Sequence, residues 1–454
     1  MRTLLSHGEN PKKHPRRRYI ARSAGLQQAT SHRVYAYRTH KLIAAVLIPA
    51  LGCAAVVNAD ESMSPADPGP PLFSFSGFGT LGEVHSNDDR ADFTSSLFKP
   101  TGAGYTHSWS ADVDSLIAGQ VTATFSPKFS AVLQVISEQS YNNTYTPQVE
   151  WANIKYQFTP DFSIRAGRTV LPCFFLSDTR NVGYTYAWVR PPVEVYHLLP
   201  VATSDGLDVS YRSHLGELAD TIQLNAGGDT THLTDNGGDS KARHSWGVSD
   251  TAELGALTVR VTYQYTNLTV PALDSFFGEL RQFGPQGAAI ADRYDADHKP
   301  NRFFDIGAGY DPGAWFLMTE WAYSQTNSFV TQSSAWDVGG GYRLGKLTPY
   351  VLFARTKADK LSDPGLDLSS VPAVLVGHAI GLNAELNSIL STNPVQSTGS
   401  IGARWDFVKN CDLKLQLDHT RLGAGSSGTL INIQPGFRLG GTLDLFSAAV
   451  DFVW

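Results

Sequence analysis

Three glycines near residue 80 have the spacing of a nucleotide-binding loop. The stretch FSGFGTLGE, residues 75–83, contains G-x-G-x-x-G at Gly77, Gly79 and Gly82. That motif binds a pyrophosphate where a strand ends and a helix begins, because the helix N-terminus receives the phosphates. The residues that follow, VHSNDDRADFTSS, are polar and lack the 3.6-residue apolar period of a helix. We therefore expect the glycines to lie within a strand and predict no cofactor.

The sequence also lacks the usual signatures of catalysis and metal binding. No cluster of Cys and His has metal-ligand spacing, and neither H-E-x-x-H nor G-x-S-x-G occurs. His197 and His214 fall near expected loops and turns, but no nucleophile stands in an obvious relation to either. We predict no catalytic residues and no metal site, and hence a protein that is not an enzyme.

The N-terminal region has the features of an export signal. The apolar run LIAAVLIPALGCAAVV, residues 42–57, is shorter than the ~20 residues that a membrane-spanning helix needs. It follows Lys41, and Val57 and Ala59 occupy the positions that a signal peptidase reads. We expect residues 1–59 to be an extended signal peptide region and residues 60–72 a short periplasmic segment. An alternative interpretation uses Cys53 as a lipoprotein cysteine.

Charge is distributed unevenly between this leader and the rest of the chain. Residues 1–59 hold ten of the 36 Lys and Arg residues but one of the 42 Asp and Glu residues. Removal of the leader would leave a chain more acidic than the formal net charge of −6 indicates. Such a chain repels polyanions as a whole, so we predict no nucleic-acid partner.

The remaining sequence is dominated by short segments with a two-residue period. The clearest is LTVRVTYQYTN, residues 257–267, in which one face carries only apolar and aromatic side chains and the other only polar ones. A strand of a soluble β-sandwich would bury the apolar face, whereas a strand of a membrane barrel would turn that face toward lipid. The connections between segments decide between these alternatives.

Seven compact turns alternate with longer polar connections along the chain. The turns are FSPKFS, FTPDFS, SHLGELAD, AELGAL, YDPGAW, RLGKLTP and FVKNCDL, and each joins two alternating segments. With one further strand at each end, the count is sixteen and both termini lie at the rim of short turns. We predict an all-β transmembrane antiparallel barrel over residues 73–454, with short periplasmic turns, long extracellular loops and no helical domain.

The last strand carries a continuous apolar face that ends on an aromatic residue. In LFSAAVDFVW, residues 445–454, this face comprises Phe446, Ala448, Val450, Phe452 and Trp454. The ending resembles the C-terminal signature of Gram-negative outer-membrane proteins. That resemblance implies an assembly signal at Phe452 and Trp454, read by the outer-membrane assembly machinery.

Several segments together resemble the Gram-negative porins, over essentially all of residues 73–454. They are SGFGTLG, SAVLQVISEQ, VEWANIKYQFTPDFSIRAGR and the terminal AAVDFVW. The resemblance implies an exported outer-membrane barrel in contact with lipid and lipopolysaccharide. It further implies a third long loop folded into the lumen, and a possible homotrimer.

The third long connection, residues 169–203, has the composition expected of a loop packed inside the barrel. It is aromatic and contains four prolines, whereas exposed loops are usually more polar. An ordered external loop or a trimer contact is the alternative. We expect the pore constriction to be formed by charges of this loop and of the wall before it, namely Lys155, Arg165, Arg168, Asp178, Arg180, Arg190 and Glu194.

These expectations favour a porin, an aqueous channel for passive diffusion of small hydrophilic solutes or ions. A sixteen-stranded barrel is too wide for side chains alone to fill. Two other classes stay open at this point: an outer-membrane enzyme built on a barrel, such as a phospholipase or protease, and a structural or adhesion barrel with a closed lumen.

Overall fold

The computed structural model describes residues 72–454, with gaps at 235–236 and 392. The expected signal peptide region, residues 1–59, lies outside the described residues, as does the segment 60–71. Within the described part, the helices are too short or too polar to cross a membrane.

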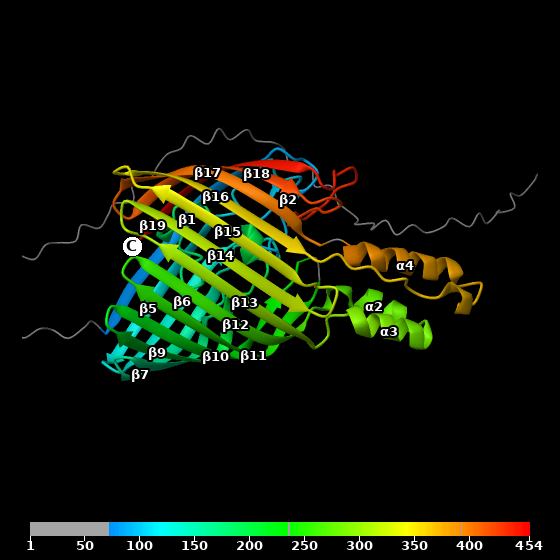
Figure 1. The fold of residues 1–454 in the computed structure, drawn as a ribbon, viewed down its shortest axis with the longest axis horizontal. Helices are drawn as coiled ribbons and strands as arrows, with labels where there is room; N and C mark the ends of the chain where they lie inside the picture. Colours follow the sequence, from blue (N-terminus) through cyan, green and yellow to red (C-terminus); the bar gives the residue numbers. More distant parts are fainter. Residues whose placement is uncertain (1–71, 235–236, 392) are drawn as a thin grey trace, which may run out of the picture. The chain divides into compact units, whose positions relative to one another are not determined.

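Sixteen long strands form a closed antiparallel barrel, as predicted (Figure 1). Strand β1 (Phe73–Ser86) closes the ring by pairing with β19 (Thr442–Val453) on one side and β5 (Leu116–Ser126) on the other. The remaining strands follow in chain order: β6 (Phe129–Glu138), β7 (Gln148–Thr159), β8 (Phe162–Val170), β9 (Thr203–Leu215), β10 (Leu218–His232), β11 (Asp239–Leu254), β12 (Leu257–Thr269), β13 (Lys299–Tyr310), β14 (Trp315–Thr326), β15 (Ser333–Tyr342), β16 (Leu347–Ala358), β17 (Val395–Val408) and β18 (Cys411–Leu422).

The connections at the two rims differ, although less uniformly than the sequence suggested. All seven compact turns join neighbouring strands at one rim. At the opposite rim five connections are long: 87–115, 171–202, 270–298, 359–394 and 423–441. The other three, 139–147, 233–238 and 327–332, are short. The first long connection contains the two-residue strands β2 (Asp92–Phe93), β3 (Ala103–Gly104) and β4 (Trp109–Ser110).

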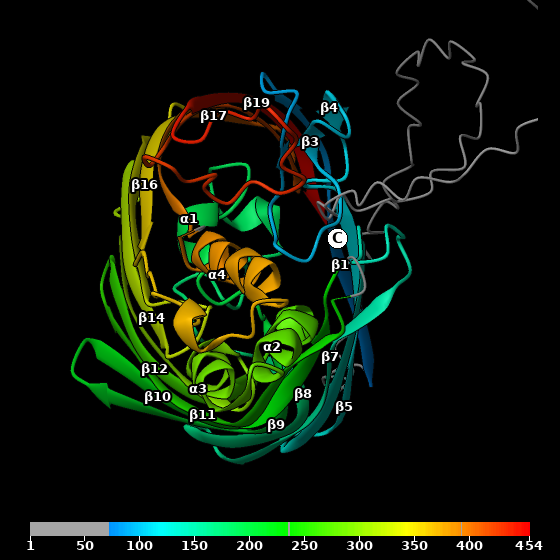
Figure 2. The same cartoon turned by 90° about the vertical axis from the view of Figure 1, so that its right-hand side faces the viewer.

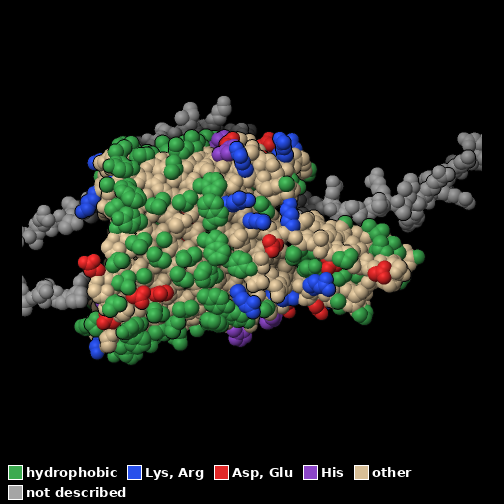
Figure 3. All heavy atoms as spheres, viewed as in Figure 1, with side chains coloured by type: hydrophobic (Ala, Val, Ile, Leu, Met, Phe, Trp, Pro, Cys, Tyr) green, Lys and Arg blue, Asp and Glu red, His purple; other side chains and the backbone are tan. Residues whose placement is uncertain are grey.

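Polarity across the barrel wall is the reverse of that in a soluble protein. On β12, Val261 is 36% exposed on the outer face, while Thr262 on the inner face is 0% exposed. Burial alternates in the same way along β16 and β18, and Figure 3 shows hydrophobic side chains spread over the outside of the barrel. An apolar exterior and a polar interior suit a barrel surrounded by lipid.

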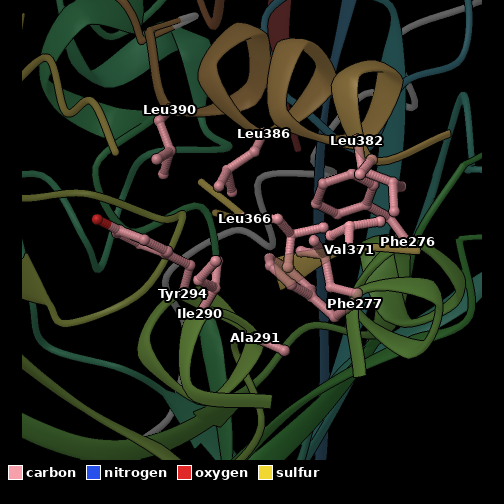
Figure 4. Packing of buried hydrophobic residues seen from close by; sticks show 12 residues of the cluster. Phe276, Phe277, Ile290, Ala291, Tyr294, Leu366, Val371, Leu382, Leu386 and Leu390 are labelled. Atoms are coloured by element: carbon pink, nitrogen blue, oxygen red, sulfur yellow. The ribbon is translucent and has the colours of Figure 1, made fainter. Parts of the chain in front are cut away.

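Helices in two of the long connections form a cluster that the sequence analysis did not anticipate. They are α2 (Asp274–Arg281) and α3 (Gly284–Tyr294), preceded by η2 (Pro271–Leu273), and α4 (Val376–Ser391), preceded by η3 (Leu368–Ser370). They share a hydrophobic core that includes Phe277, Leu280, Leu382 and Leu386 (Figure 4). These loops therefore add a small helical crown to the predicted barrel at its long-loop rim.

The glycines at residues 77–82 lie in strand β1, where the absence of side chains lets other parts of the chain pack closely against the strand. A Cβ atom on Gly77 would lie 2.0 Å from the ring of Trp454, and one on Gly79 would lie 2.5 Å from the ring of Phe452. Both aromatic rings belong to the terminal segment that closes the barrel. A Cβ on Gly82 would instead lie 2.6 Å from Cβ of Asp114, which belongs to the first long connection. The spacing thus reflects close approach to other parts of the chain.

Candidate pore and its inner loop

The third connection at the long-loop rim, counted along the chain, lies inside the barrel. Residues 171–202, named the inner loop here, include η1 (Gly183–Thr185) and the short helix α1 (Val193–Tyr196). Figure 2 shows α1 enclosed by the ring of strands, and its residues pack against β14, β15 and β16. Most of the prolines and aromatics that made this segment unusual in the sequence are thereby buried, and the others, Phe175, Tyr184, Pro191 and Pro200, are half-buried.

Glycines in the barrel wall make room for two aromatic side chains of the inner loop. Phe175 lies against Gly307 and Gly309 of β13, where an added Cβ on Gly307 would be 2.6 Å from Cβ of Phe175. Trp188 lies against Gly339 of β15, where an added Cβ would be 3.0 Å from the Trp188 ring. Because a larger residue would displace these rings, the wall and the loop fit each other through side-chain shape.

Polar side chains of the wall hold the first part of the inner loop by its backbone. Arg260 on β12 donates to the carbonyl of Phe174 at 3.0 Å and pairs with Asp178 at 2.8 Å. Glu320 on β14 accepts from the backbone N–H of Phe175 at 2.6 Å. Together these groups fix the loop where it turns away from β8.

The middle of the loop is held by two cations from strands β17 and β18. Lys414 donates to the carbonyls of Gly183, at 2.6 Å, and Trp188, at 3.0 Å, and its ammonium group also pairs with Asp451 at 2.8 Å. Arg404 donates to the carbonyl of Tyr184 at 2.7 Å. Both side chains point into the lumen, where they reach the backbone of the loop.

Arg190 makes the most extensive set of side-chain bonds in the loop. Its guanidinium forms two hydrogen bonds with Asp114 at 2.8 and 2.6 Å, donates to Ser447 at 2.7 Å, and lies 3.5 Å from Asp418. Asp114 precedes β5 at the end of the first long connection, whereas Asp418 and Ser447 belong to β18 and β19. Arg190 therefore ties the inner loop to the first connection and to the wall at once.

The last part of the loop is held through Glu194. Its carboxylate accepts hydrogen bonds from Gln396, at 2.8 Å, and from Thr398, both on β17. Burial raises the pKa of the Glu194 carboxyl above its usual range, and the two hydrogen bonds oppose that effect. Glu194 thus acts as a structural contact inside the barrel.

The inner loop separates two cavities of the lumen. One, of about 280 Å³, lies between the loop, the first connection and strands β1, β5, β7 and β10. The other, of about 420 Å³, lies toward the short turns and is lined by residues such as Phe316 and Arg343. Tyr186 of the inner loop borders both cavities. A route through the barrel would therefore pass this residue.

Charges of both signs line the smaller of these cavities, the upper cavity. Lys99 pairs with Glu138 at 3.4 Å, and the Arg190–Asp114 pair borders it as well. Arg180 also lines the upper cavity, and within the described part of the chain its guanidinium has no ion-pair partner. Arg180 is consequently available to a passing solute.

The structure brings together some of the charges expected at a constriction and separates others. Arg180 and Arg190 line the upper cavity, while Asp178 and Glu194 are engaged in the contacts that anchor the loop.

The three cations of the wall differ from one another in position. Arg168 borders the upper cavity, but it lies on the face of β8 that carries Ile164 and pairs with Asp205 at 2.7 Å. Lys155 and Arg165 lie nearer the short turns, and neither lines either cavity; Arg165 pairs with Asp208 at 2.8 Å.

Phe452 and Trp454 lie on the outer face, with ring centroids 5.9 Å apart. Two contacts of the inner loop that the sequence analysis did not identify are those of Asp114 with Arg190 and of Glu150 with Asn181, since both depend on the fold.

Comparison with known proteins supports the fold. No protein-family model matches the chain, and no curated protein matches it. Among solved structures, OmpF of Salmonella typhi in complex with daunomycin has a TM-score of 0.51 and 14% identity, covering 84% of this chain and 97% of that one. The outer membrane channel DcaP of Acinetobacter baumannii has a TM-score of 0.49 and 11% identity, covering 84% and 97%. An anion-selective porin from Comamonas acidovorans has a TM-score of 0.48 and 10% identity, covering 84% and 99%.

The first of these likenesses shows that the chain has the outer-membrane β-barrel fold of the porins. The resemblance noted in the sequence is thus confirmed at the level of fold.

Proposed function

We propose that this barrel is an aqueous channel of the outer membrane, through which small hydrophilic solutes or ions diffuse passively. The observation that carries the proposal is the inner loop. It lies inside a polar lumen, is anchored to the wall along its length, and leaves a cavity on each side of Tyr186. A loop held in this way narrows a wide barrel without filling it.

The proposed setting follows from the barrel surface. The apolar exterior contacts the lipid and lipopolysaccharide of the outer membrane, with the short turns toward the periplasm and residues 1–59 acting in export. A homotrimer is part of the proposal because porins commonly take that form. The assembly machinery would read the end of β19, at Phe452 and Trp454.

Conductance measured on the purified full chain in a planar lipid bilayer tests the channel function. A channel gives discrete, ohmic current steps whose size grows with salt concentration. A barrel enzyme or an adhesion barrel with a closed lumen gives no such steps. Absence of current from protein that is demonstrably folded would overturn the proposal.

Arg180 offers a direct test of where ions pass. Replacing it with glutamate (Arg180→Glu) reverses an unpaired charge in the upper cavity, so the cation-to-anion permeability ratio should rise. We expect roughly a fivefold change, the factor that about 1 kcal/mol represents. Reversal potentials in a salt gradient measure it.

The matched control is Arg355→Glu, which makes the same charge change on the outer face of β16. It should leave the permeability ratio as in the parent. Equal shifts in both variants would show that Arg180 does not lie on the ion path.

A further inference from the structure

One cavity of the lumen differs in character from the rest. It has a volume of about 390 Å³ and lies between the end of the inner loop, the first connection and the inner wall from β9 to β14. Apolar side chains from five separate parts of the chain line it, including Leu97, Leu171, Leu198, Leu233, Leu268 and Val330. Other apolar side chains of the inner face, such as Phe303, Met318 and Leu352, pack against the inner loop. Those around this cavity instead leave an open volume between them, which calls for a separate explanation.

Polar side chains of the wall beside this cavity are largely engaged with one another. Gln264 exchanges hydrogen bonds with Asn225 at 2.9 and 3.1 Å. Asn301 donates to Ser324 at 3.2 Å, and the Ser245 hydroxyl lies 2.7 Å from that of Thr266. Because these groups have partners in the protein, they hold water in the cavity weakly. Two other lining residues, His197 and Ser204, bury ring nitrogens and a hydroxyl that have no hydrogen-bond partner within the described part of the chain. The lining therefore favours an uncharged occupant that is largely apolar.

The apolar cavity adjoins the proposed path of solutes. Phe98, Pro200, Val201 and Thr203 line both it and the upper cavity. A molecule bound among the leucines would therefore be placed directly beside the space that contains Arg180.

Size and charge restrict the occupant. An apolar cavity of about 150 Å³ is enough to hold benzene, so about 390 Å³ accommodates one or two rings or a short aliphatic chain. Among the described lining residues, the carboxylate is that of Asp229, which accepts a hydrogen bond from Thr231 at 2.6 Å. It would repel an anion, and the leucines give a charged group no compensating partner.

We propose that this cavity is a binding site for small uncharged aromatic or short aliphatic molecules at the long-loop side of the channel. The binding site stands on the cavity alone, whereas its use in uptake rests on the proposed channel function. In that role it would raise the local concentration of apolar solutes above the inner loop, from which they enter the upper cavity.

The test is to locate a bound apolar probe by X-ray diffraction. Crystals of the full barrel are soaked with bromobenzene, and the bromine is located by its anomalous signal. This positional readout separates the cavity from detergent and from the apolar outer face. We expect a peak among Leu171, Leu198 and Leu268 in the parent protein. It should be lost in the double variant Leu198→Asn/Leu268→Asn, which places amides in the lining.

A control variant makes the same kind of change elsewhere. Val374→Asn alters a residue that is 88% exposed before α4, so the bromine peak should persist. Heat-modifiable migration on a gel shows whether each variant is folded. A peak confined to the outer face of the parent barrel, or no peak in it, overturns the binding site. So does a peak that survives in a folded double variant.

The bilayer experiment separates this inference from the channel proposal. Ion conductance without bromobenzene in the cavity would reject the binding site and leave the channel standing. Bromine in the cavity of a protein without conductance would reject the channel and leave the site.

Discussion

Replacing Arg190 with alanine is expected to lower the free energy of unfolding by about 3–5 kcal/mol. It should also remove one of the contacts that hold the inner loop against the wall. The reason is that Arg190 neutralises two buried carboxylates, those of Asp114 and Asp418. Arg190 is 7% exposed, and its guanidinium bonds Asp114 through two hydrogen bonds and lies 3.5 Å from Asp418. Without the cation, both carboxylates are left buried with less compensation. Reversible denaturation of the barrel in lipid vesicles measures the loss.

The same substitution should alter the channel. Arg190 connects the inner loop to the first connection and to strands β18 and β19. Once that link is removed, the part of the loop around residue 190 can move relative to the wall, while Lys414 and Arg404 still hold residues 183–188. We expect larger and noisier single-channel currents than in the parent. An unchanged conductance in a folded Arg190→Ala protein would show that the loop position does not limit the current.

Arg212→Ala provides the matched control. Arg212 pairs with Glu253 at 2.9 Å, and both side chains are about half exposed. A pair so exposed to solvent contributes roughly 0–1 kcal/mol. The control should therefore leave stability and conductance close to those of the parent. If the two arginine variants lose equal stability, burial of the Arg190 network is not the cause.

The barrel could be predicted because its signals are local. Period-two alternation marks each strand, and compact turns containing Gly, Pro or Asn mark seven of the connections. The same alternation places Arg260, Arg404 and Lys414 on polar faces, and in the structure all three reach the inner loop. Composition alone indicated that residues 169–203 require a packed environment.

Two features were missed although the sequence contained a signal. Arg165 and Arg168 are three residues apart, and in a strand that separation puts them on opposite faces. Only one of them can therefore point inward. In α4, Ala379, Leu382, Leu386 and Leu390 recur at helical spacing, which indicates the crown.

Other features depend on contacts between distant parts of the chain and have no local signal. Asp114 meets Arg190 because the first connection and the inner loop both enter the lumen. Lys155 and Arg165 were expected opposite the inner loop, but the height of a residue in the barrel depends on strand tilt and register. Alternation gives the face of a strand, and it does not give the partner across the lumen.

The closing strands provide the second prediction, which concerns Gly77. Gly77→Ala should lower the free energy of unfolding by about 1–3 kcal/mol, the usual range for an overpacked site. The added Cβ would lie 2.0 Å from the ring of Trp454, so the ring has to move. That ring lies where the first and last strands of the barrel join, since Gly77 and Trp454 exchange backbone hydrogen bonds at 3.2 and 3.0 Å. Refolding into lipid vesicles, followed by denaturation, measures the effect without the cellular assembly machinery.

Gly119→Ala is the control, and a Trp454→Ala background tests whether the clash with the ring causes the loss of stability. Gly119 pairs in register with Gly77 across β1 and β5, yet an added Cβ there meets nothing within 4 Å. Gly119→Ala should therefore be tolerated. If the clash with the ring is the cause, Gly77→Ala should cost much less in a Trp454→Ala background than in the parent, giving a non-additive double-mutant cycle. Additive losses would mean that Gly77 is needed for backbone conformation. In that case the G-x-G spacing would not be explained by the aromatic end of the chain.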